Sequence, residues 1–322
     1  MRDTLQTIGF VLHYICRSNF CKQVMPACAF SMVEELTKSH VHMKDPEFVK
    51  KTIQQMTNDG HQKLQVVADF DRTLSKYTNK GKVCSTCHNV LEESKVMPDF
   101  YKEKAKVLRD TYYPIELNHD LTIQEKTPKM IEWWTNAHKL MNQCSMTQVD
   151  IKNMVAESNA QLRDGCQWFI DHLHKLEIPL LIFSAGIGDI IEEVIKQQSY
   201  MYDNMKIVSN YMDFDDTGKM VGFKGDIIHI YNKNENAIHS SDYFERLNHR
   251  DNILLLGDSL GDLHMVEGAE VTNLLKIGFL NQKVEESLDL YKEKFDVVIV
   301  EDESLDVVNG ITKAILNIPS QQ

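Results

Sequence analysis

Six short runs of apolar, often β-branched residues constrain the fold of this chain more than any other feature of its sequence. The runs occupy residues 64–68, 180–183, 207–208, 253–256, 274–277 and 297–300. Because they are continuous rather than alternating with polar residues, they have the pattern of strands buried on both faces of a parallel sheet. Helical stretches, such as residues 187–198 and 285–292, lie between them. This alternation predicts an α/β fold with a doubly wound parallel sheet.

The interval between the first two runs lacks a strand pattern. Residues 89–162 carry helical signals instead, among them Thr122-Ile123-Gln124-Glu125, which has the spacing of a capping box. We therefore predict a smaller, all-helical domain at residues 89–162, inserted into an α/β core of residues 41–88 and 163–322.

Residues 1–40 show no sustained period and are expected to form a flexible leader. Their apolar segment, residues 8–16, is too short to span a membrane, and no clear small-residue cleavage site follows it. A weak signal peptide is therefore the less favoured interpretation. No run of about 18 apolar residues occurs anywhere in the chain, so we expect no membrane partner.

The net charge of the chain limits the kinds of partner that we expect, and its cysteine content indicates the cellular compartment. Acidic residues outnumber Lys and Arg by 47 to 35, which gives a formal net charge of −12 at pH 7. A surface of this sign repels a phosphate backbone, which argues against DNA or RNA as the main partner. The seven cysteines are an odd number spread over 322 residues, a pattern that favours free thiols in a reducing compartment. We expect a cytoplasmic monomer.

Acidic clusters follow two of the predicted strands. Asp69 and Asp71 come directly after the first strand, and residues i and i+2 of an extended chain project to the same side. Asp258 and Asp262 follow the strand at 253–256. Ligands of open α/β sheets bind outside the carboxyl ends of strands, where such carboxylates suit nucleophilic attack, proton transfer or Mg²⁺ binding. Taken alone, the first cluster is equally compatible with aspartates that cap a helix, and for the second a turn with a helix N-cap would be favoured. The position of both clusters after a buried strand makes coincidence much less likely.

Two further polar segments lie between these clusters. Ser184 follows the strand at 180–183 and begins a predicted helix, where a hydroxyl and free backbone N–H groups form an anion site. Lys233 stands in a polar loop and would by itself be an ordinary solvated lysine. We interpret Lys233 as functional only because the other three segments are present in the same chain.

In their order along the chain, these segments resemble the four motifs of the haloacid dehalogenase-like phosphatases: Asp69-x-Asp71-x-Thr73, Ser184, Lys233 and Gly257-Asp258-x-x-Gly261-Asp262. Further segments are similar to the cytosolic pyrimidine 5′-nucleotidase family, cytosolic 5′-nucleotidase type III. They lie at residues 112–116, 183–189, 208–214, 222–225 and 276–281. The similarity runs from about Val41 to the C-terminus, and the family does not explain the segment before it.

The resemblance implies a Mg²⁺-dependent enzyme that hydrolyses nucleoside 5′-monophosphates such as CMP, UMP and 7-methyl-GMP. Asp69 would attack the phosphorus and become an aspartyl-phosphate. Asp71 would protonate the ribose 5′-oxygen and then activate water. The family places Mg²⁺ on the Asp69 carboxylate, the Asp71 backbone carbonyl and Asp258. It also implies that Asp262 orients Lys233 or a metal-bound water.

The same resemblance implies the contacts to substrate. Lys233 and Ser184, with the Ala185 amide, would bind the phosphoryl oxygens. The helical insertion corresponds to the family's cap domain, in which Glu116 matches the carboxylate that contacts the nucleobase. Where the family often carries a base-site serine, this chain has Ala137, so the base preference stays open.

Three residues of the insertion region are candidates for stacking on the base: Trp133, Trp134 and His88. A core position for each tryptophan, and a surface-loop position for His88, are equally compatible with the sequence. The segment Cys84-Ser85-Thr86-Cys87-His88 has zinc-ligand residue types but no second pair nearby, so we interpret it as a loop that joins core and cap.

Three hypotheses for the function remain. The first is the 5′-nucleotidase described above. The second is a nucleoside phosphotransferase, which passes the phosphoryl group of the same intermediate to a nucleoside. The third is a nucleotide-binding protein that has lost catalysis, against which the intact Asp69, Asp71, Lys233 and Asp258 argue. A sugar- or amino-acid-phosphate phosphatase is more distant, because Glu116 and the aromatic cap disfavour it.

Overall fold

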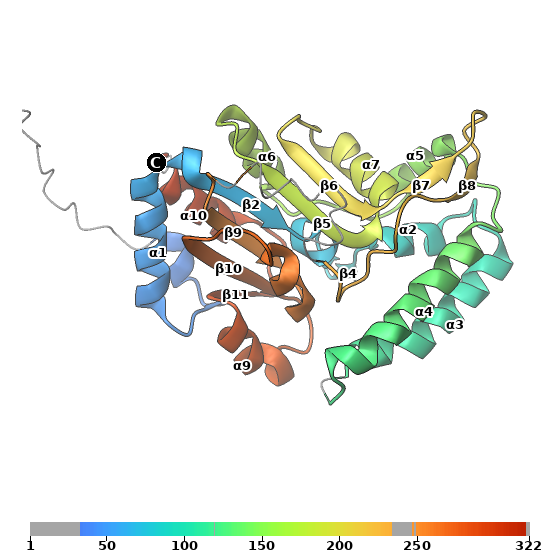
Figure 1. Cartoon of the computed structure of the whole chain (residues 1–322), viewed down its shortest axis with the longest axis horizontal. Helices are drawn as coiled ribbons and strands as arrows, with labels where there is room; N and C mark the ends of the chain where they lie inside the picture. Colours follow the sequence, from blue (N-terminus) through green and yellow to red (C-terminus); the bar gives the residue numbers. More distant parts are fainter. Residues whose placement is uncertain (1–32, 119, 234–246, 248, 320–322) are drawn as a thin grey trace, which may run out of the picture. The chain divides into compact units, whose positions relative to one another are not determined.

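A seven-stranded sheet forms the centre of the fold, in the order β1-β11-β10-β9-β2-β5-β6 (Figure 1). The computed structural model describes residues 33–118, 120–233, 247 and 249–319. The strands of the sheet are β1 (Val41–His42), β2 (Leu64–Ala68), β5 (Leu180–Ile187), β6 (Met205–Asn210), β9 (Asn252–Gly257), β10 (Asn273–Leu280) and β11 (Val297–Val300). β1 is antiparallel to β11, and the other neighbours are parallel.

Each of the six predicted runs is a strand of this sheet, so the prediction of a parallel α/β sheet is confirmed. Every residue of β2 and β9 is buried, as expected for strands that are covered on both faces. No pattern in the sequence indicated β1. This strand has two half-buried residues that pair at the edge of the sheet, where a short pairing needs no apolar run.

Helices pack on the sheet at several points. They are α1 (Pro46–Asp59), α6 (Cys166–Lys175), α7 (Gly188–Gln198), α9 (Val284–Lys294) and α10 (Asp306–Ile315). α1 contacts β10 and α10, α7 contacts β5 and β6, and α9 contacts β10 and β11. None of the described helices is long and apolar enough to cross a membrane.

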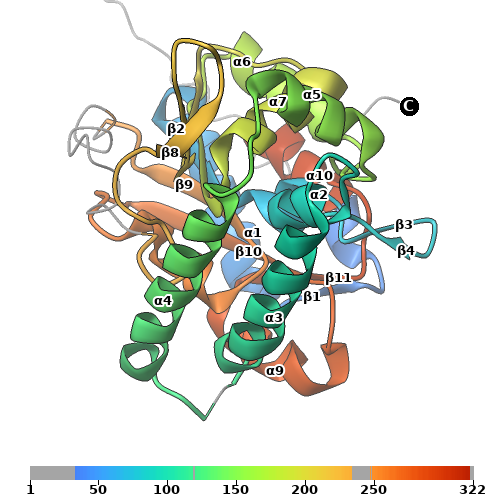
Figure 2. The same ribbon diagram turned by 90° about the vertical axis from the view of Figure 1, so that its right-hand side faces the viewer.

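Within the described part of residues 89–162, which lies between β2 and β5, the regular elements are helices, as predicted. Its helices are α2 (Cys87–Glu93), α3 (Asp99–Glu116), α4 (Ile123–Met141) and α5 (Gln148–Glu157). α3 and α4 lie side by side (Figures 1 and 2). The predicted capping box begins α4, where Thr122 and Glu125 each accept a hydrogen bond from the other's backbone N–H. α5 packs against α7, so this part of the insertion rests on the sheet domain.

Short elements complete the described chain. Two antiparallel hairpins consist of β3 (Thr78–Asn79) with β4 (Lys82–Val83), and of β7 (Met212–Phe214) with β8 (Met220–Phe223). Single helical turns are η1 (Glu34–Thr37), η2 (His61–Lys63), η3 (Phe70–Leu74) and η5 (Leu260–Val266).

The folded part begins before the boundary at residue 41 that the sequence suggested. η1 packs against α10, and its Leu36 is 3% exposed. Burial of this apolar side chain fixes a segment that has too few residues to show a period. The rest of the predicted leader, residues 1–32, lies outside the described residues.

The strand order places the acidic clusters together. From β2 the chain proceeds through β5 to β6 on one side, and β9, β10 and β11 then add on the other. The reversal lies between β2 and β9, and this is where open α/β sheets bind ligands. Asp69 follows β2 and Asp258 follows β9, while the backbone N–H of Asp69 donates to the Leu256 carbonyl at 3.0 Å.

Candidate active site

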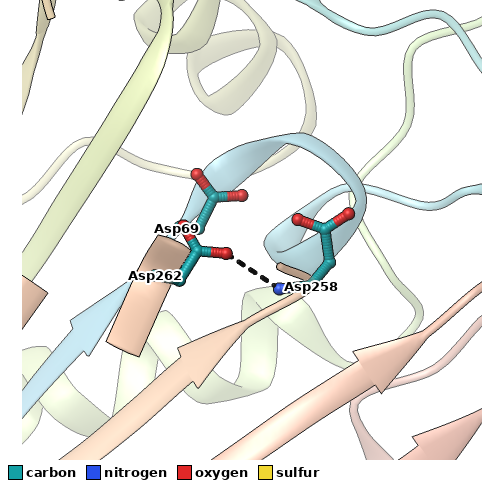
Figure 3. Close-up of side chains that lie close together, drawn as sticks. All are labelled: Asp69, Asp258 and Asp262. Atoms are coloured by element: carbon teal, nitrogen blue, oxygen red, sulfur yellow. Dashed lines mark hydrogen bonds between the residues drawn. The ribbon is translucent and has the colours of Figure 1, made fainter. Parts of the chain in front are cut away.

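Three aspartates gather at the carboxyl ends of β2 and β9. The side chains of Asp69, Asp258 and Asp262 each offer a carboxylate oxygen, and these oxygens lie within 4.8 Å of one another (Figure 3). Asp69 is 4% exposed, and Asp262 is fully buried. The two clusters predicted from separate strands therefore form one site.

Lys233 is the cation of this site. Its Nζ donates to Asp69 Oδ1 at 2.5 Å and to Asp262 Oδ1 at 2.7 Å, and the residue is 3% exposed. Burial opposes the charged form, but the carboxylates of Asp262 and Asp69 outweigh it and raise the pKa of Lys233. Lys233 is therefore an ammonium fixed between two carboxylates rather than a solvated lysine.

Burial and mutual repulsion disfavour the ionised carboxylates. Burial raises the pKa of Asp69 to about 7, against the lowering effect of Lys233 and with a further increase from Asp262. Burial also raises the pKa of Asp258 well above its usual value, and the charge of Asp69 adds to this. A bound cation would relieve this repulsion.

Both oxygens of the Asp262 carboxylate accept hydrogen bonds from other groups of the protein. Its Oδ2 accepts hydrogen bonds from the Asp258 N–H at 3.1 Å, the Ser259 N–H at 2.9 Å and Ser259 Oγ at 2.8 Å. Its Oδ1 accepts from Lys233. A Cβ on Gly257 would lie 2.6 Å from Cβ of Asp262, so only glycine leaves room for this arrangement. Asp262 therefore contacts Lys233 directly, and the orienting role expected for it stays a prediction.

Asp71 lies on the turn η3 and is held by a partner that the sequence did not indicate. Its carboxylate accepts the backbone N–H of Cys87, at 3.0 Å to Oδ1 and 3.2 Å to Oδ2. Burial raises the pKa of Asp71, and these hydrogen bonds partly offset the increase. The Cys84-x-x-Cys87-His88 segment thus reaches the active site through a backbone donor, at the first residue of α2.

The turn η3 needs support because Arg72 has a left-handed backbone, with φ at 65°. Arg163 supplies it: Nε donates to the Thr73 carbonyl at 2.7 Å and Nη2 to the Arg72 carbonyl at 2.6 Å. Arg163 is 2% exposed and follows the helical insertion. No motif singled it out, since a lone arginine gives no pattern in a sequence.

Ser184 lies within β5, so the prediction that it begins a helix is wrong: the strand continues to Ile187, and α7 begins at Gly188. Ser184 Oγ accepts the backbone N–H of Gly186 at 3.0 Å. A Cβ on Gly186 would lie 3.1 Å from Ser184 Oγ, 3.1 Å from Cys87 Sγ and 3.2 Å from Asp71 Oδ2. The Ser184–Gly186 segment, an irregular part of β5, therefore lies directly against Asp71, and the absent side chain at position 186 makes this approach possible.

We expect Gly186→Ala to lower kcat/KM by at least about tenfold, because the added methyl displaces Asp71 or Ser184 by a few tenths of an ångström and catalysis depends steeply on such positions. Steady-state phosphate release would measure the effect. Gly222→Ala is the matched control, since a Cβ there meets no atom within 4 Å. Equal kcat/KM for the two variants would contradict the prediction.

A cavity of about 270 Å³ opens over these groups. Asp69, Asp71, Ser184, Ala185, Lys233 and Asp258 line it from the sheet, so it includes all the predicted catalytic and phosphate-binding residues. Residues of α2, α3 and α4 line it from the insertion. The site thus lies between the sheet and the helical insertion.

Glu116 lies at the C-terminal end of α3 and lines this cavity. Burial raises the pKa of its carboxyl to about 7, while Arg72, Lys233 and Lys126 act in the opposite direction. Among the described residues none hydrogen-bonds to the Glu116 carboxylate, so its oxygens are available to a ligand.

The aromatic candidates also line the cavity. Trp133 and Trp134 contact each other edge to face, with ring centroids 4.8 Å apart, and His88 meets the edge of Trp134 at 6.1 Å. Burial lowers the pKa of His88 to about 4, so its ring is neutral at pH 7. Ala137 faces the same space with a methyl group.

Comparison with known proteins places these features in a family. The sequence matches the family described as Pyrimidine 5′-nucleotidase (UMPH-1) over residues 72–316. Asp69 and Asp71 stand just before the matched segment.

Individual relatives match over most of their length. The chain is similar to the 7-methylguanosine phosphate-specific 5′-nucleotidase of Gallus gallus, with 49% identity over 88% of this chain and 99% of that protein. Its identity to the Homo sapiens protein of the same name is 46%, over 88% of this chain and 95% of that protein.

Solved structures of other proteins are also similar to this chain. The fold resembles the crystal structure of cytosolic 5′-nucleotidase IIIB bound to cytidine, with a TM-score of 0.81 and 33% identity over 89% of this chain and 97% of that chain. A haloacid dehalogenase family hydrolase from Salmonella enterica serovar Typhi matches with a TM-score of 0.51 and 13% identity, over 77% of this chain and 71% of that chain. The second similarity concerns the fold alone.

Proposed function

Because this chain belongs to the pyrimidine 5′-nucleotidase (UMPH-1) family, hydrolases with a haloacid dehalogenase-like fold, we propose that it cleaves nucleoside 5′-monophosphates through a phosphorylated Asp69. The observation that supports this most directly is the convergence of Asp69, Ser184, Lys233 and Asp258 in one cavity. CMP, UMP and 7-methyl-GMP are the proposed substrates. The relatives from Gallus gallus and Homo sapiens are named for 7-methylguanosine phosphate.

In the first step, an oxygen of Asp69 attacks the phosphorus, and the bond from phosphorus to the ribose 5′-oxygen breaks. Asp71 gives its proton to the departing oxygen, a role that fits a carboxyl whose pKa is raised by burial. In the second step, Asp71 takes a proton from water, which attacks the phosphorus and releases phosphate from Asp69. Nucleoside and phosphate are the products.

The donor set suits Mg²⁺. The carboxylates of Asp69, Asp258 and Asp262 lie together, and the ammonium of Lys233 neutralises only part of their charge, so negative charge remains for a divalent ion. The carboxylates of Asp69 and Asp258, with the Asp71 backbone carbonyl, would hold it, and these hard oxygens are the ligands that Mg²⁺ prefers. When bound, the ion reduces the repulsion between the Asp69 carboxylate and the phosphate.

Chelation of divalent metals is expected to lower nucleotide hydrolysis by at least about a hundredfold, because the like charges of nucleophile and substrate then meet unscreened. Phosphate release would be measured after dialysis against EDTA and again after addition of Mg²⁺, which should restore it. Full activity in a metal-free sample, with metal content checked by atomic absorption, would contradict the prediction.

The residues that line the cavity supply the proposed contacts to substrate. Lys233, Ser184 and the Ala185 N–H bind the phosphoryl oxygens, and Glu116 accepts hydrogen bonds from an exocyclic amine of the base. Ala137 has no hydroxyl to offer the base. We also propose the cytoplasm as the compartment. The four described cysteines are free and buried, which suits a reducing environment.

Phosphate release from CMP, UMP, 7-methyl-GMP, AMP and GMP, each with and without Mg²⁺, tests the proposal. We expect hydrolysis of at least one pyrimidine or 7-methylguanine nucleotide. Hydrolysis confined to a phosphate ester that lacks a nucleoside would disprove it. Adding a free nucleoside and following its phosphorylation separates the nucleotidase from the phosphotransferase.

A further inference from the structure

The peptide group between Ala185 and Gly186 is held at both of its ends. Its N–H, on Gly186, donates to Ser184 Oγ at 3.0 Å. Its carbonyl, on Ala185, accepts two hydrogen bonds, from Trp134 Nε1 and from Asn210 Nδ2, each at 3.0 Å. Trp134 comes from α4 of the insertion, whereas Asn210 ends β6 of the sheet.

This peptide controls the hydroxyl of Ser184. Because Ser184 Oγ accepts the Gly186 N–H, its own proton is left to donate toward the cavity, where the phosphoryl oxygens are proposed to lie. Rotation of the peptide would turn the N–H away from Ser184 Oγ and release the hydroxyl. The two donors to the Ala185 carbonyl oppose that rotation.

Asn210 connects the two parts of the chain that contact phosphate. Besides the Ala185 carbonyl, its Nδ2 reaches the Gly186 carbonyl at 3.2 Å and the Ile228 carbonyl at 2.8 Å. Its Oδ1 accepts the Ile228 N–H at 2.9 Å. Ile228 lies five residues before Lys233, and Asn210 is 2% exposed. One buried side chain therefore ties the Ser184–Gly186 segment to the segment that leads to Lys233.

Trp134 differs from its neighbour Trp133 in the hydrogen bonding of its indole N–H. Its indole N–H crosses from the insertion to the Ala185 carbonyl. Trp133 stacks on Tyr112 at a centroid distance of 6.0 Å and makes no hydrogen bond to the described residues. Both rings line the cavity. Packing alone therefore does not explain why an indole stands at position 134.

We propose that Trp134 and Asn210 are positioning residues of the Ser184–Gly186 segment, and that together they fix the Ala185–Gly186 peptide so that Ser184 presents its hydroxyl to the phosphoryl group. The insertion thereby contributes to phosphate affinity as well as to the base pocket. This rests on the proposed function, in which Ser184 and Ala185 bind phosphate.

Trp134→Phe tests the proposal because it keeps an aromatic ring and removes the N–H. Inorganic phosphate is the probe, and its dissociation constant is measured by calorimetry in the presence of Mg²⁺. Loss of one hydrogen bond of typical strength should weaken phosphate binding by about three- to tenfold. KM should rise by the same factor for CMP and for ribose 5-phosphate, which has no base. Trp133→Phe is the control and should bind phosphate like the wild type.

Two results would overturn the proposal. Unchanged phosphate affinity in Trp134→Phe, with a higher KM for CMP only, would mean that Trp134 acts on the base alone. Equal weakening in Trp133→Phe would mean that any loss of aromatic packing in α4 has this effect. The calorimetry decides between these cases even if the wild-type protein releases no phosphate from nucleotides, a result that would instead disprove the proposed function.

Asn210→Ala extends the test to the sheet side. It removes several buried hydrogen bonds, so the variant is first checked for folding by circular dichroism. In the folded variant we expect phosphate binding to weaken by at least about tenfold. The effects of Trp134→Phe and Asn210→Ala should not be additive in the double variant, since both act on the same carbonyl. Additive effects would contradict a shared role.

Discussion

Asp69→Asn is expected to abolish phosphate release while leaving the protein folded. An amide cannot attack the phosphorus, and the neighbouring carboxylates of Asp71 and Asp258 have other proposed roles, in proton transfer and in metal binding. The amide has nearly the same shape, and its oxygen can still accept the hydrogen bond from Lys233. Because burial raises the pKa of Asp69 to about 7, the folded site disfavours the ionised group, so a neutral side chain should not destabilise it.

The experiment compares kcat for CMP and the thermal melting temperature of the variant with those of the wild type. Asp213→Asn, at an exposed position on β7, is the matched control for the same chemical change. A variant that keeps its melting temperature and loses nearly all turnover has lost chemistry rather than structure. If Asp69→Asn retains more than about a hundredth of the wild-type rate, the nucleophile is wrongly assigned.

The sequence was sufficient to predict that the acidic groups converge. Asp69 and Asp258 each follow a continuous apolar run, and such runs become neighbouring parallel strands whose carboxyl ends share one edge. Ser184 follows a third run, on the other side of β2. Lys233 is different, because its loop has no period. Its place in the site was predicted only from the family resemblance, and its hydrogen bonds to both Asp69 and Asp262 are a finding of the structure.

The hydrogen bonds that hold the site residues in place could not be predicted from the apolar runs. Cys87 is 16 residues from Asp71, Trp134 is 51 residues from Ala185, and Arg163 is 90 residues from Thr73. Each of these hydrogen bonds depends on where the chain of the helical insertion packs against the sheet. That packing produces no periodic pattern in the sequence. The Cys87 donor is also a backbone N–H, which every residue except proline possesses.

Asp71→Asn is expected to separate the two chemical steps. Asparagine cannot protonate the ribose 5′-oxygen, so turnover of CMP should fall by at least about a hundredfold, the usual contribution of general acid–base catalysis. An ester with an acidic leaving group, such as p-nitrophenyl phosphate, needs no protonation to depart. Its phosphoryl group should still transfer to Asp69, but the variant then lacks the base that activates water. The phosphorylated enzyme should therefore accumulate.

A rapid-mixing experiment with p-nitrophenyl phosphate would reveal this state as a burst of p-nitrophenolate that equals the enzyme concentration, followed by a slow steady state. Mass spectrometry of the acid-quenched protein should show one added phosphoryl group on the peptide that contains Asp69. The Asp69→Asn, Asp71→Asn double variant is the control and should give neither signal. A steady state without a burst, at a rate reduced equally for CMP and for p-nitrophenyl phosphate, would instead mean that Asp71 acts before the leaving group departs, by holding the η3 turn in place.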